Sequence, residues 1–138
     1  MNNNNQILIN SSTKNLHLVR DFIEQKAKEL NIDTNTANQI IVSVDEACTN
    51  IIKHTYKYNE NNTIEVEYKT EEHSFIIIIR YKGKSFDPSK KHTPNMKHYF
   101  AKYKVGGLGI PLMKKSMDKI EFTHTKPDLN SLTLIKEI

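Results

Sequence analysis

Apolar residues recur every three or four positions in two long segments of the N-terminal half, and this spacing predicts two amphipathic helices. The first helix is expected over residues 14–30. The second is expected to begin at Asp33 or Thr34, which can cap it, and to end near Tyr58. Before them, apolar and polar residues alternate over residues 6–9, which predicts a first strand.

The rest of the apolar pattern has the shorter period of β-strands. Residues 63–69 and 74–81 flank a short polar turn and predict an antiparallel hairpin. The isoleucine run 76–79 is typical of a strand that is buried on both faces. Two further strands are expected over residues 119–125 and 131–138, joined by a turn.

Between the hairpin and the last strands the pattern is lost. Residues 82–107 contain prolines, lysines and histidines without a clear period, and we interpret them as a long loop or lid. A helix is expected over residues 108–117, and residues 1–5 form a polar, loose tail. The element order predicts an α/β (α+β) two-layer sandwich in one domain over residues 1–138, with helices on one face of a mostly antiparallel sheet.

Composition narrows the classes of function. The net charge of +4 favours anionic partners only weakly, because Lys and Arg are interleaved with Asp and Glu, and direct nucleic-acid binding is not indicated. Cys48 has no second cysteine to pair with, and no secretion signal is visible, which together favour the cytoplasm. The longest apolar run, residues 75–79, is too short to cross a bilayer, so no membrane anchor is expected.

Glu46 and Asn50 are four positions apart and are predicted to share the helix face opposite the apolar stripe. An exposed acid and amide on one face usually form only a solvated surface. Lys53 and His54 follow about one turn later, where they fit either phosphate contacts or an ordinary charged helix end.

Three of the four glycines, Gly106, Gly107 and Gly109, stand together before the predicted helix that follows the loop. Backbone N–H groups at such a helix start can bind phosphate, although the glycines could also serve only to turn the chain. Gly83 and Asp87 follow the isoleucine strand in a stretch that would be an ordinary loop in most proteins.

Taken in order, these segments resemble the GHKL superfamily, whose ATP-binding domain has the Bergerat fold, and within it the bacterial anti-sigma factor serine/threonine kinases. Glu46 and Asn50 match the first motif of that family, the N box. Gly83 and the sequence Phe86-Asp87-Pro88 match its first glycine box, and Gly107 and Gly109 match the second. The resemblance extends over residues 14–138.

The resemblance implies ATP and Mg²⁺ as cofactors, with Glu46 as the general base and Asn50 as a magnesium ligand. The cofactor-binding residues that it implies are Asn50, His54, Gly83, Asp87, Gly107, Leu108 and Gly109. It further implies a sigma factor and a STAS-type anti-sigma factor antagonist as partners, a role in transcription regulation and a possible homodimer. The family has a threonine near the adenine on the last strand, where this chain has Ser131 and Thr133.

One residue departs from the family pattern. Tyr81 stands where the first glycine box has the aspartate that accepts a hydrogen bond from the adenine amino group. A phenol is larger than a carboxylate and is neutral at pH 7, so it could stack on a base or fill its pocket. Two hypotheses follow: an ATP-dependent anti-sigma factor kinase, or a nucleotide-independent binding module with a degenerate ATP site. A sensor histidine kinase is disfavoured, because the chain has no room for a dimerisation helix pair.

Overall fold

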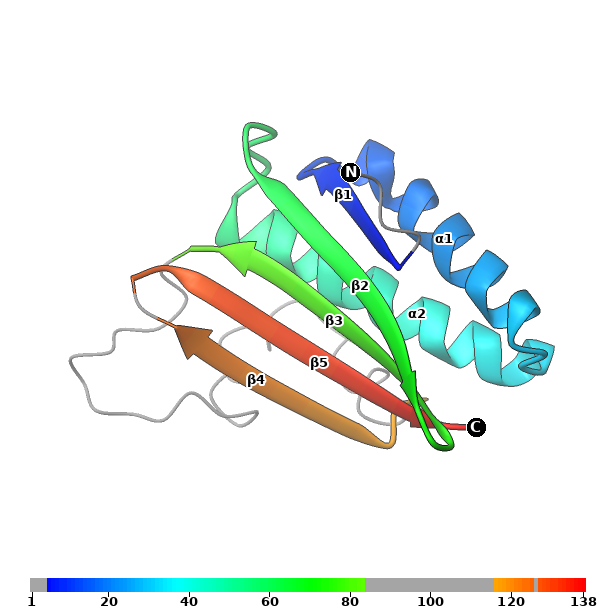
Figure 1. Cartoon of the computed structure of the whole chain (residues 1–138). Coiled ribbons are helices and arrows are strands. Elements are labelled where there is room, and N and C mark those ends of the chain that lie inside the picture. Colours follow the sequence, from blue (N-terminus) through cyan, green and yellow to red (C-terminus); the bar gives the residue numbers. More distant parts are fainter. Residues whose placement is uncertain (1–4, 84–115, 126) are drawn as a thin grey trace.

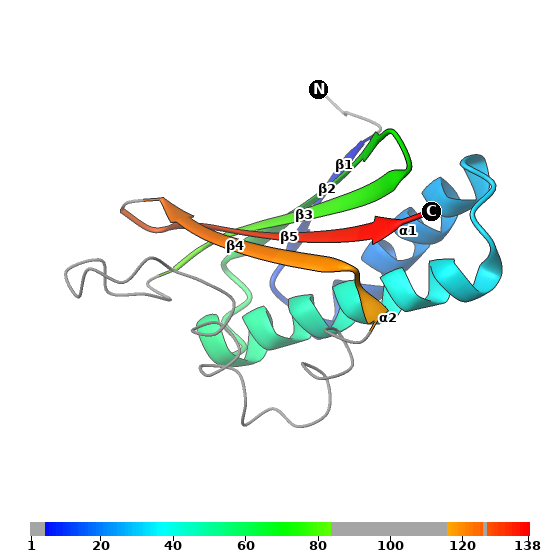
Figure 2. The same cartoon turned by 90° about the horizontal axis from the view of Figure 1, so that it is seen from below.

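The computed structural model describes residues 5–83, 116–125 and 127–138. Five strands form one antiparallel sheet in the order β1-β2-β3-β5-β4. They are β1 (Gln6–Asn10), β2 (Thr63–Glu71), β3 (Ser74–Lys82), β4 (Lys119–Thr125) and β5 (Leu129–Glu137). The helices α1 (Leu16–Glu29) and α2 (Thr34–Asn50) both lie on one face of this sheet, as Figures 1 and 2 show.

Both helices begin at polar residues that can satisfy free backbone N–H groups. The side chain of Ser12 accepts a hydrogen bond from Lys14, in a short 3₁₀ helix, Thr13–Asn15, that leads into α1. Asp33 caps α2 by accepting from both the backbone and the hydroxyl of Thr36, and these hydrogen bonds lower the pKa of its carboxyl. At its C-terminus α2 continues without a break into a π-helix, η2 (Ile51–Thr55).

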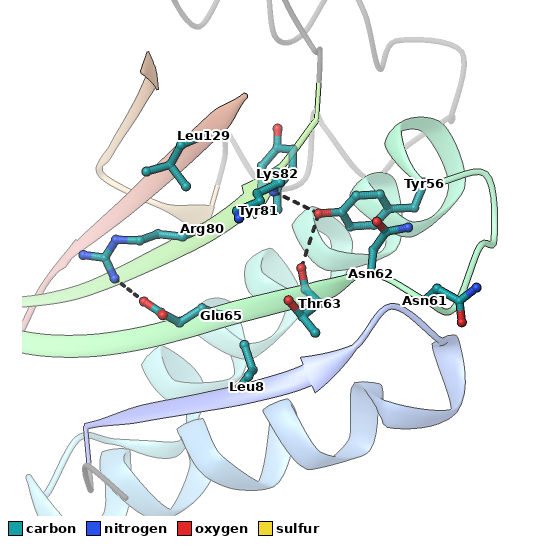
Figure 3. A pocket seen from close by; sticks show the side chains of 10 residues that line it. All are labelled: Leu8, Tyr56, Asn61, Asn62, Thr63, Glu65, Arg80, Tyr81, Lys82 and Leu129. Carbon is teal, nitrogen blue, oxygen red and sulfur yellow. Dashed lines mark hydrogen bonds and ion pairs between the residues drawn. The ribbon is translucent and has the colours of Figure 1, made fainter. Parts of the chain in front are cut away.

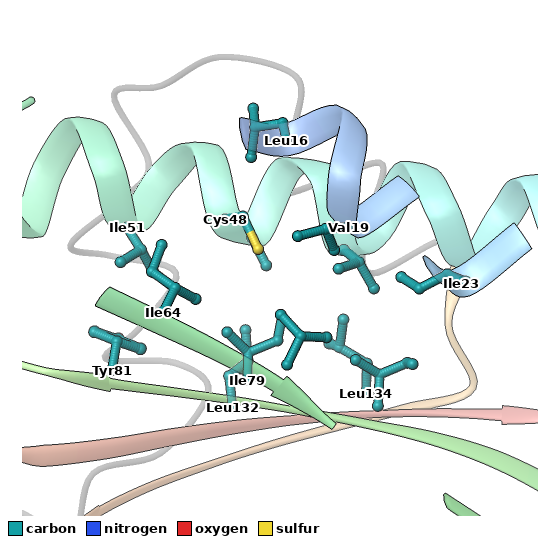
Figure 4. Packing of buried hydrophobic residues seen from close by; sticks show 14 of the residues in the cluster. Leu16, Val19, Ile23, Cys48, Ile51, Ile64, Ile79, Tyr81, Leu132 and Leu134 are labelled. Carbon is teal, nitrogen blue, oxygen red and sulfur yellow. The ribbon is translucent and has the colours of Figure 1, made fainter. Parts of the chain in front are cut away.

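The core lies between the helices and the inner face of the sheet (Figure 4). Buried side chains of α1 and α2 pack there on alternating residues of the central strands, such as Ile77 and Ile79 of β3 and Leu132 and Leu134 of β5. The side chain of Tyr81 belongs to this cluster and lies at the same end of it as Ile51.

The outer face of the sheet is not covered by the described helices, and paired charges cross its strands. Arg80 donates to Glu65 at 2.6 Å and to Glu67 at 2.7 Å. Burial opposes its charge, but the hydrogen bonds and the negative charges of Glu67 and Glu65 together outweigh it and raise the pKa of Arg80. Ile76 and Ile78 also lie on this face and are nevertheless buried, so the prediction of a strand buried on both faces is confirmed.

The predicted fold class is confirmed, with all five strands and both helices within a few residues of their expected positions. The second helix differs most, since its last turn is π-helical. The predicted loop from residue 84 onward and nearly all of the predicted helix 108–117 lie outside the described residues. In the part of the chain that is described, no helix has the length and apolar character required to span a membrane.

Candidate functional site

The predicted site residues that the structure describes come from α2, η2 and the end of β3. Glu46 is half-buried on α2, Asn50 ends that helix and His54 lies in η2. Gly83 directly follows β3. Asp87, Gly107, Leu108 and Gly109 lie outside the described residues.

Asn50 does not lie opposite the apolar stripe, so that prediction is wrong. Its exposed fraction is 4%, and its amide nitrogen has no hydrogen-bond partner in the described structure. The reason is geometric, because Asn50 follows the buried Ala47 by three positions and therefore lies only about 60° from it around the helix. A buried amide group without a partner costs about 1–3 kcal/mol, which makes Asn50 a candidate ligand-binding group.

Asn50 also fits magnesium. Mg²⁺ prefers oxygen ligands and usually takes one or two from the protein, with water and phosphate oxygens completing its shell. The amide of Asn50 can offer an oxygen to the metal and an N–H group to a phosphate oxygen. Among the described residues no group of three His, Cys, Asp or Glu side chains is placed to hold a metal.

Tyr81 lies on β3, two residues before Gly83, and its side chain points into the core. Its exposed fraction is 2%, and its ring makes an edge-on contact with the ring of Tyr56 at a centroid distance of 6.5 Å. The phenol is therefore packed into the core on the helix side of the sheet. It occupies space at the strand position where the family resemblance implies a base-reading carboxylate.

Tyr56 joins the end of η2 to the ends of two strands. Its hydroxyl accepts a hydrogen bond from the backbone N–H of Lys82 at 2.9 Å and donates to the carbonyl of Thr63 at 3.3 Å. Figure 3 shows this hydroxyl between β2 and β3, where it extends their hydrogen-bonded ladder by a side-chain group. The position of η2 is thereby tied to the residues that precede Gly83.

A second polar group lies beside Tyr81 on the inner face. Asn130 of β5 is fully buried, and its register partners are Tyr81 on β3 and His124 on β4. Its amide nitrogen donates to the carbonyl of Gly83 at 2.9 Å, and its oxygen lies 2.7 Å from Nδ1 of His124. Because the carbonyl can only accept, this orientation of the amide is fixed, and Nδ1 of His124 must carry the hydrogen.

Asn130 and His124 were missed by the sequence analysis, which placed the start of the last strand two residues too late. The alternation of buried residues along this strand could have identified Asn130, because it has the same parity as Leu132 and Leu134. Ser131 and Thr133 have the opposite parity and lie on the outer face of the sheet. Neither can therefore reach the helix side, where Asn50 and Tyr81 lie.

The pocket shown in Figure 3 is a different feature, because it opens on the outer face. Leu8, Glu65, Arg80 and Leu129 line it, and the ion pair of Arg80 with Glu65 crosses it. Tyr56 and Tyr81 also line it, but the described site residues Glu46, Asn50, His54 and Gly83 do not, so the pocket is not the site that those residues form.

Comparison with known proteins identifies the group to which this arrangement belongs. The family model described as "Histidine kinase-like ATPase domain" matches residues 9–136. The serine-protein kinase RsbW of Bacillus subtilis is 28% identical over 109 residues, which cover 75% of this chain and 67% of that protein. The proteins of the same name from Halalkalibacterium halodurans and Staphylococcus aureus are 30% identical over 113 residues and 36% identical over 84 residues. These matches cover 75% and 57% of this chain, and 65% and 53% of the respective relatives. The resemblance to the GHKL kinases is thus confirmed, and the chain belongs to the histidine kinase-like ATPase domain family.

Proposed function

We propose that this protein is an anti-sigma factor with ATP-dependent serine/threonine protein kinase activity toward an anti-sigma factor antagonist. The observation that carries the proposal is the buried amide of Asn50 at the end of α2, whose nitrogen has no partner among the described residues, in a chain similar to serine-protein kinases. Its partners are a sigma factor and a serine-bearing antagonist of the STAS type, and the protein acts in transcription regulation.

In this proposal Glu46 takes the proton of the substrate serine hydroxyl. The serine oxygen then forms a bond to the γ-phosphorus, the bond from that phosphorus to the β–γ bridging oxygen breaks, and ADP leaves. Asn50 would hold magnesium, which when bound would neutralise charge on the phosphate oxygens. His54, Gly83, Asp87 and the second glycine box, Gly107, Leu108 and Gly109, complete the nucleotide site.

Replacing the proposed base tests the catalytic part. Glu46→Gln keeps the shape of the side chain but removes its basicity, so we expect phosphotransfer to an antagonist protein to fall about 10²- to 10⁴-fold. Calorimetric binding of ADP and magnesium should stay within about threefold of the unmodified protein, because Glu46 acts on the serine. Asp45→Asn is the matched control, since Asp45 is the adjacent half-buried carboxylate and pairs with Arg20 on α1. Unchanged phosphotransfer by Glu46→Gln would remove Glu46 as the base.

A second function is favoured by one observation, the burial of Tyr81 in the core. In this alternative the protein is a nucleotide-independent partner-binding module with a degenerate ATP site. Titration with ATP and ADP in magnesium separates the two functions when it is repeated on Tyr81→Asp and on the control Tyr81→Phe. Micromolar binding by the unmodified chain supports the kinase. Binding that appears only in Tyr81→Asp supports the module.

A further inference from the structure

The helical turn that follows Asn50 is wider than an α-helical turn. In η2 the backbone N–H of Tyr56 donates to the carbonyl of Ile51, five residues earlier, at 3.0 Å. Just beyond it, the N–H of Tyr58 donates to the carbonyl of Ile52 at 2.8 Å. Such π turns are rare and are frequent at functional sites, so the contacts that hold this one in place are informative.

The wide turn packs directly on Gly83 through the methyl group of Thr55. A Cβ atom built on Gly83 would lie 2.7 Å from Cγ2 of Thr55, closer than real Cβ contacts. Only glycine therefore permits this approach. Gly83 is also held by two hydrogen bonds, since its N–H donates to the carbonyl of Asp128 at 2.8 Å and its carbonyl accepts from Asn130 at 2.9 Å.

These contacts fix the position of η2, and with it the helix end that carries Asn50. Gly83 cannot retreat from Thr55 without breaking its two hydrogen bonds to β5 and the turn before it. A Cβ atom on residue 83 would displace the methyl of Thr55 from its present position. The contact between Thr55 and Gly83, together with the hydrogen bonds of the Tyr56 hydroxyl, therefore relates the end of α2 to the end of β3.

We propose that Thr55 is a positioning residue, which through its contact with Gly83 places the buried amide of Asn50 for a magnesium-bound nucleotide. The inference rests on the proposed function for its ligand. It goes further by assigning a role to a residue that does not itself touch the ligand.

The experiment compares ADP affinity with magnesium and with EDTA, both measured by calorimetry on the full chain. The dissociation constant in EDTA divided by that in magnesium, called the magnesium ratio, reports how strongly magnesium supports ADP binding. Gly83→Ala should reduce this ratio at least tenfold, because the new methyl group displaces Thr55 and with it Asn50. Asn50→Ala should bring the ratio close to one. Thr55→Ser, which keeps the hydroxyl and removes the contacting methyl, should lower the ratio by about threefold, because the contact is lost but no atom of Gly83 displaces the helix end.

The double variant Gly83→Ala with Thr55→Ser is the decisive sample. It should restore most of the magnesium ratio that Gly83→Ala loses. The recovery should be incomplete, because φ of Gly83 is +157° and alanine is strained there. If the double variant is no better than Gly83→Ala, the proposal is wrong, and Gly83 acts by direct approach to the ligand or through its backbone. An equal loss of affinity in magnesium and in EDTA would also overturn it.

A second pair of variants avoids the backbone strain at Gly83, should Gly83→Ala fail to fold. Thr55→Ile and Thr55→Val both lose the hydroxyl and keep the methyl that faces Gly83, but isoleucine adds one more carbon atom, on the branch that replaces the hydroxyl, and so increases the bulk beside Gly83. Thr55→Ile should lower the magnesium ratio strongly relative to Thr55→Val, and equal ratios would contradict the proposal.

The side-chain amide signals of Asn50 in NMR spectra test the positioning without any nucleotide. They should shift in Thr55→Ile and stay near their original position in Thr55→Val. Signals that respond equally overturn the role of Thr55, whatever the protein binds. The Asn50 signals could respond as expected while the unmodified chain binds no ADP. In that case the positioning role of Thr55 holds, but the proposed function fails, because the ligand is not a magnesium-bound nucleotide.

Discussion

The hydroxyl of Tyr56 should stabilise the fold through the two strand ends that it joins, and Tyr56→Phe removes that hydroxyl alone. The variant keeps the edge-on ring contact with Tyr81 but leaves the N–H of Lys82 and the carbonyl of Thr63 without this partner. A typical intramolecular hydrogen bond contributes about 1 kcal/mol, so the two bonds together predict a loss of about 1–2 kcal/mol. Lys82 and Thr63 are exposed residues that water can reach, which favours the lower end of this range.

Urea unfolding measures this loss as a lower midpoint with an unchanged slope. For a chain of this length, the corresponding fall in Tm is about 3–6 °C. Tyr68→Phe is the matched control, because Tyr68 stacks on Phe75 at 5.6 Å and its hydroxyl has no hydrogen bond within the described residues. The control should change stability by less than about 0.5 kcal/mol.

Hydrogen exchange shows whether the effect is local. In Tyr56→Phe the amide of Lys82 should exchange faster, since it loses its acceptor, while the amides of β3 that pair within the sheet should keep their protection. Equal stability of Tyr56→Phe and Tyr68→Phe, together with unchanged exchange at Lys82, would refute the role given to the Tyr56 hydroxyl.

Three further predictions concern other buried groups. Burial, with a smaller contribution from the charge of Asp45, raises the pKa of the Cys48 thiol from 9.0 to about 12. As the pH rises, the Cys48 thiol therefore loses its proton at a lower pH in the unfolded chain than in the folded chain. The free energy of unfolding should fall between about pH 9 and about pH 12. From about pH 8 to about pH 10.5 it should fall by about 2 kcal/mol more in the unmodified protein than in Cys48→Ala. Urea titrations at the two pH values check this, and parallel losses would contradict it. The ammonium of Lys26 lies 5.8 Å and 5.4 Å from the ring centroids of Phe22 and Tyr68, and its side chain is only 9% exposed. Thermal unfolding should show that Lys26→Ala costs about 1–2 kcal/mol and the exposed control Lys28→Ala less than about 0.5 kcal/mol. Nitrogen chemical shifts of His124 should report hydrogen on Nδ1 in the neutral ring, and Asn130→Leu should abolish this preference, because the accepting oxygen is removed. A neutral ring with hydrogen on Nε2 in the unmodified protein would exclude the proposed orientation of Asn130.

The regular elements could be predicted because each follows from residues close together in sequence. Alternation defined the strands, and the isoleucine run correctly indicated burial on both faces, since Ile76 and Ile78 are covered even on the outer face. The helices followed from their three-to-four spacing, and Asp33 caps α2 in the way its position predicted. Local propensity and the final packing agree in these segments, which is why a single sequence sufficed.

The π turn could not be predicted in this way. Residues 51–55 continue the apolar spacing of α2, and no residue among them marks a change of helix type. The wide turn is stabilised by groups distant in sequence, namely the glycine at position 83 and the strand ends that accept and donate to Tyr56. Such tertiary contacts override local preference, and a periodic pattern carries no information about them.

The same limit applies to the candidate site, where the motif residues were recognisable but their environment was not. Asn50 and Asn130 are amides on the inner side of a core that is otherwise largely apolar, and burying an amide is costly unless it is used. Asn130 uses both ends of its amide within the fold, on Gly83 and His124, whereas the amide nitrogen of Asn50 has no partner among the described residues. The two groups therefore have different tasks, although their chemistry is the same. Asn130 stabilises the structure around Gly83, and Asn50 is the amide at which we expect a ligand to bind.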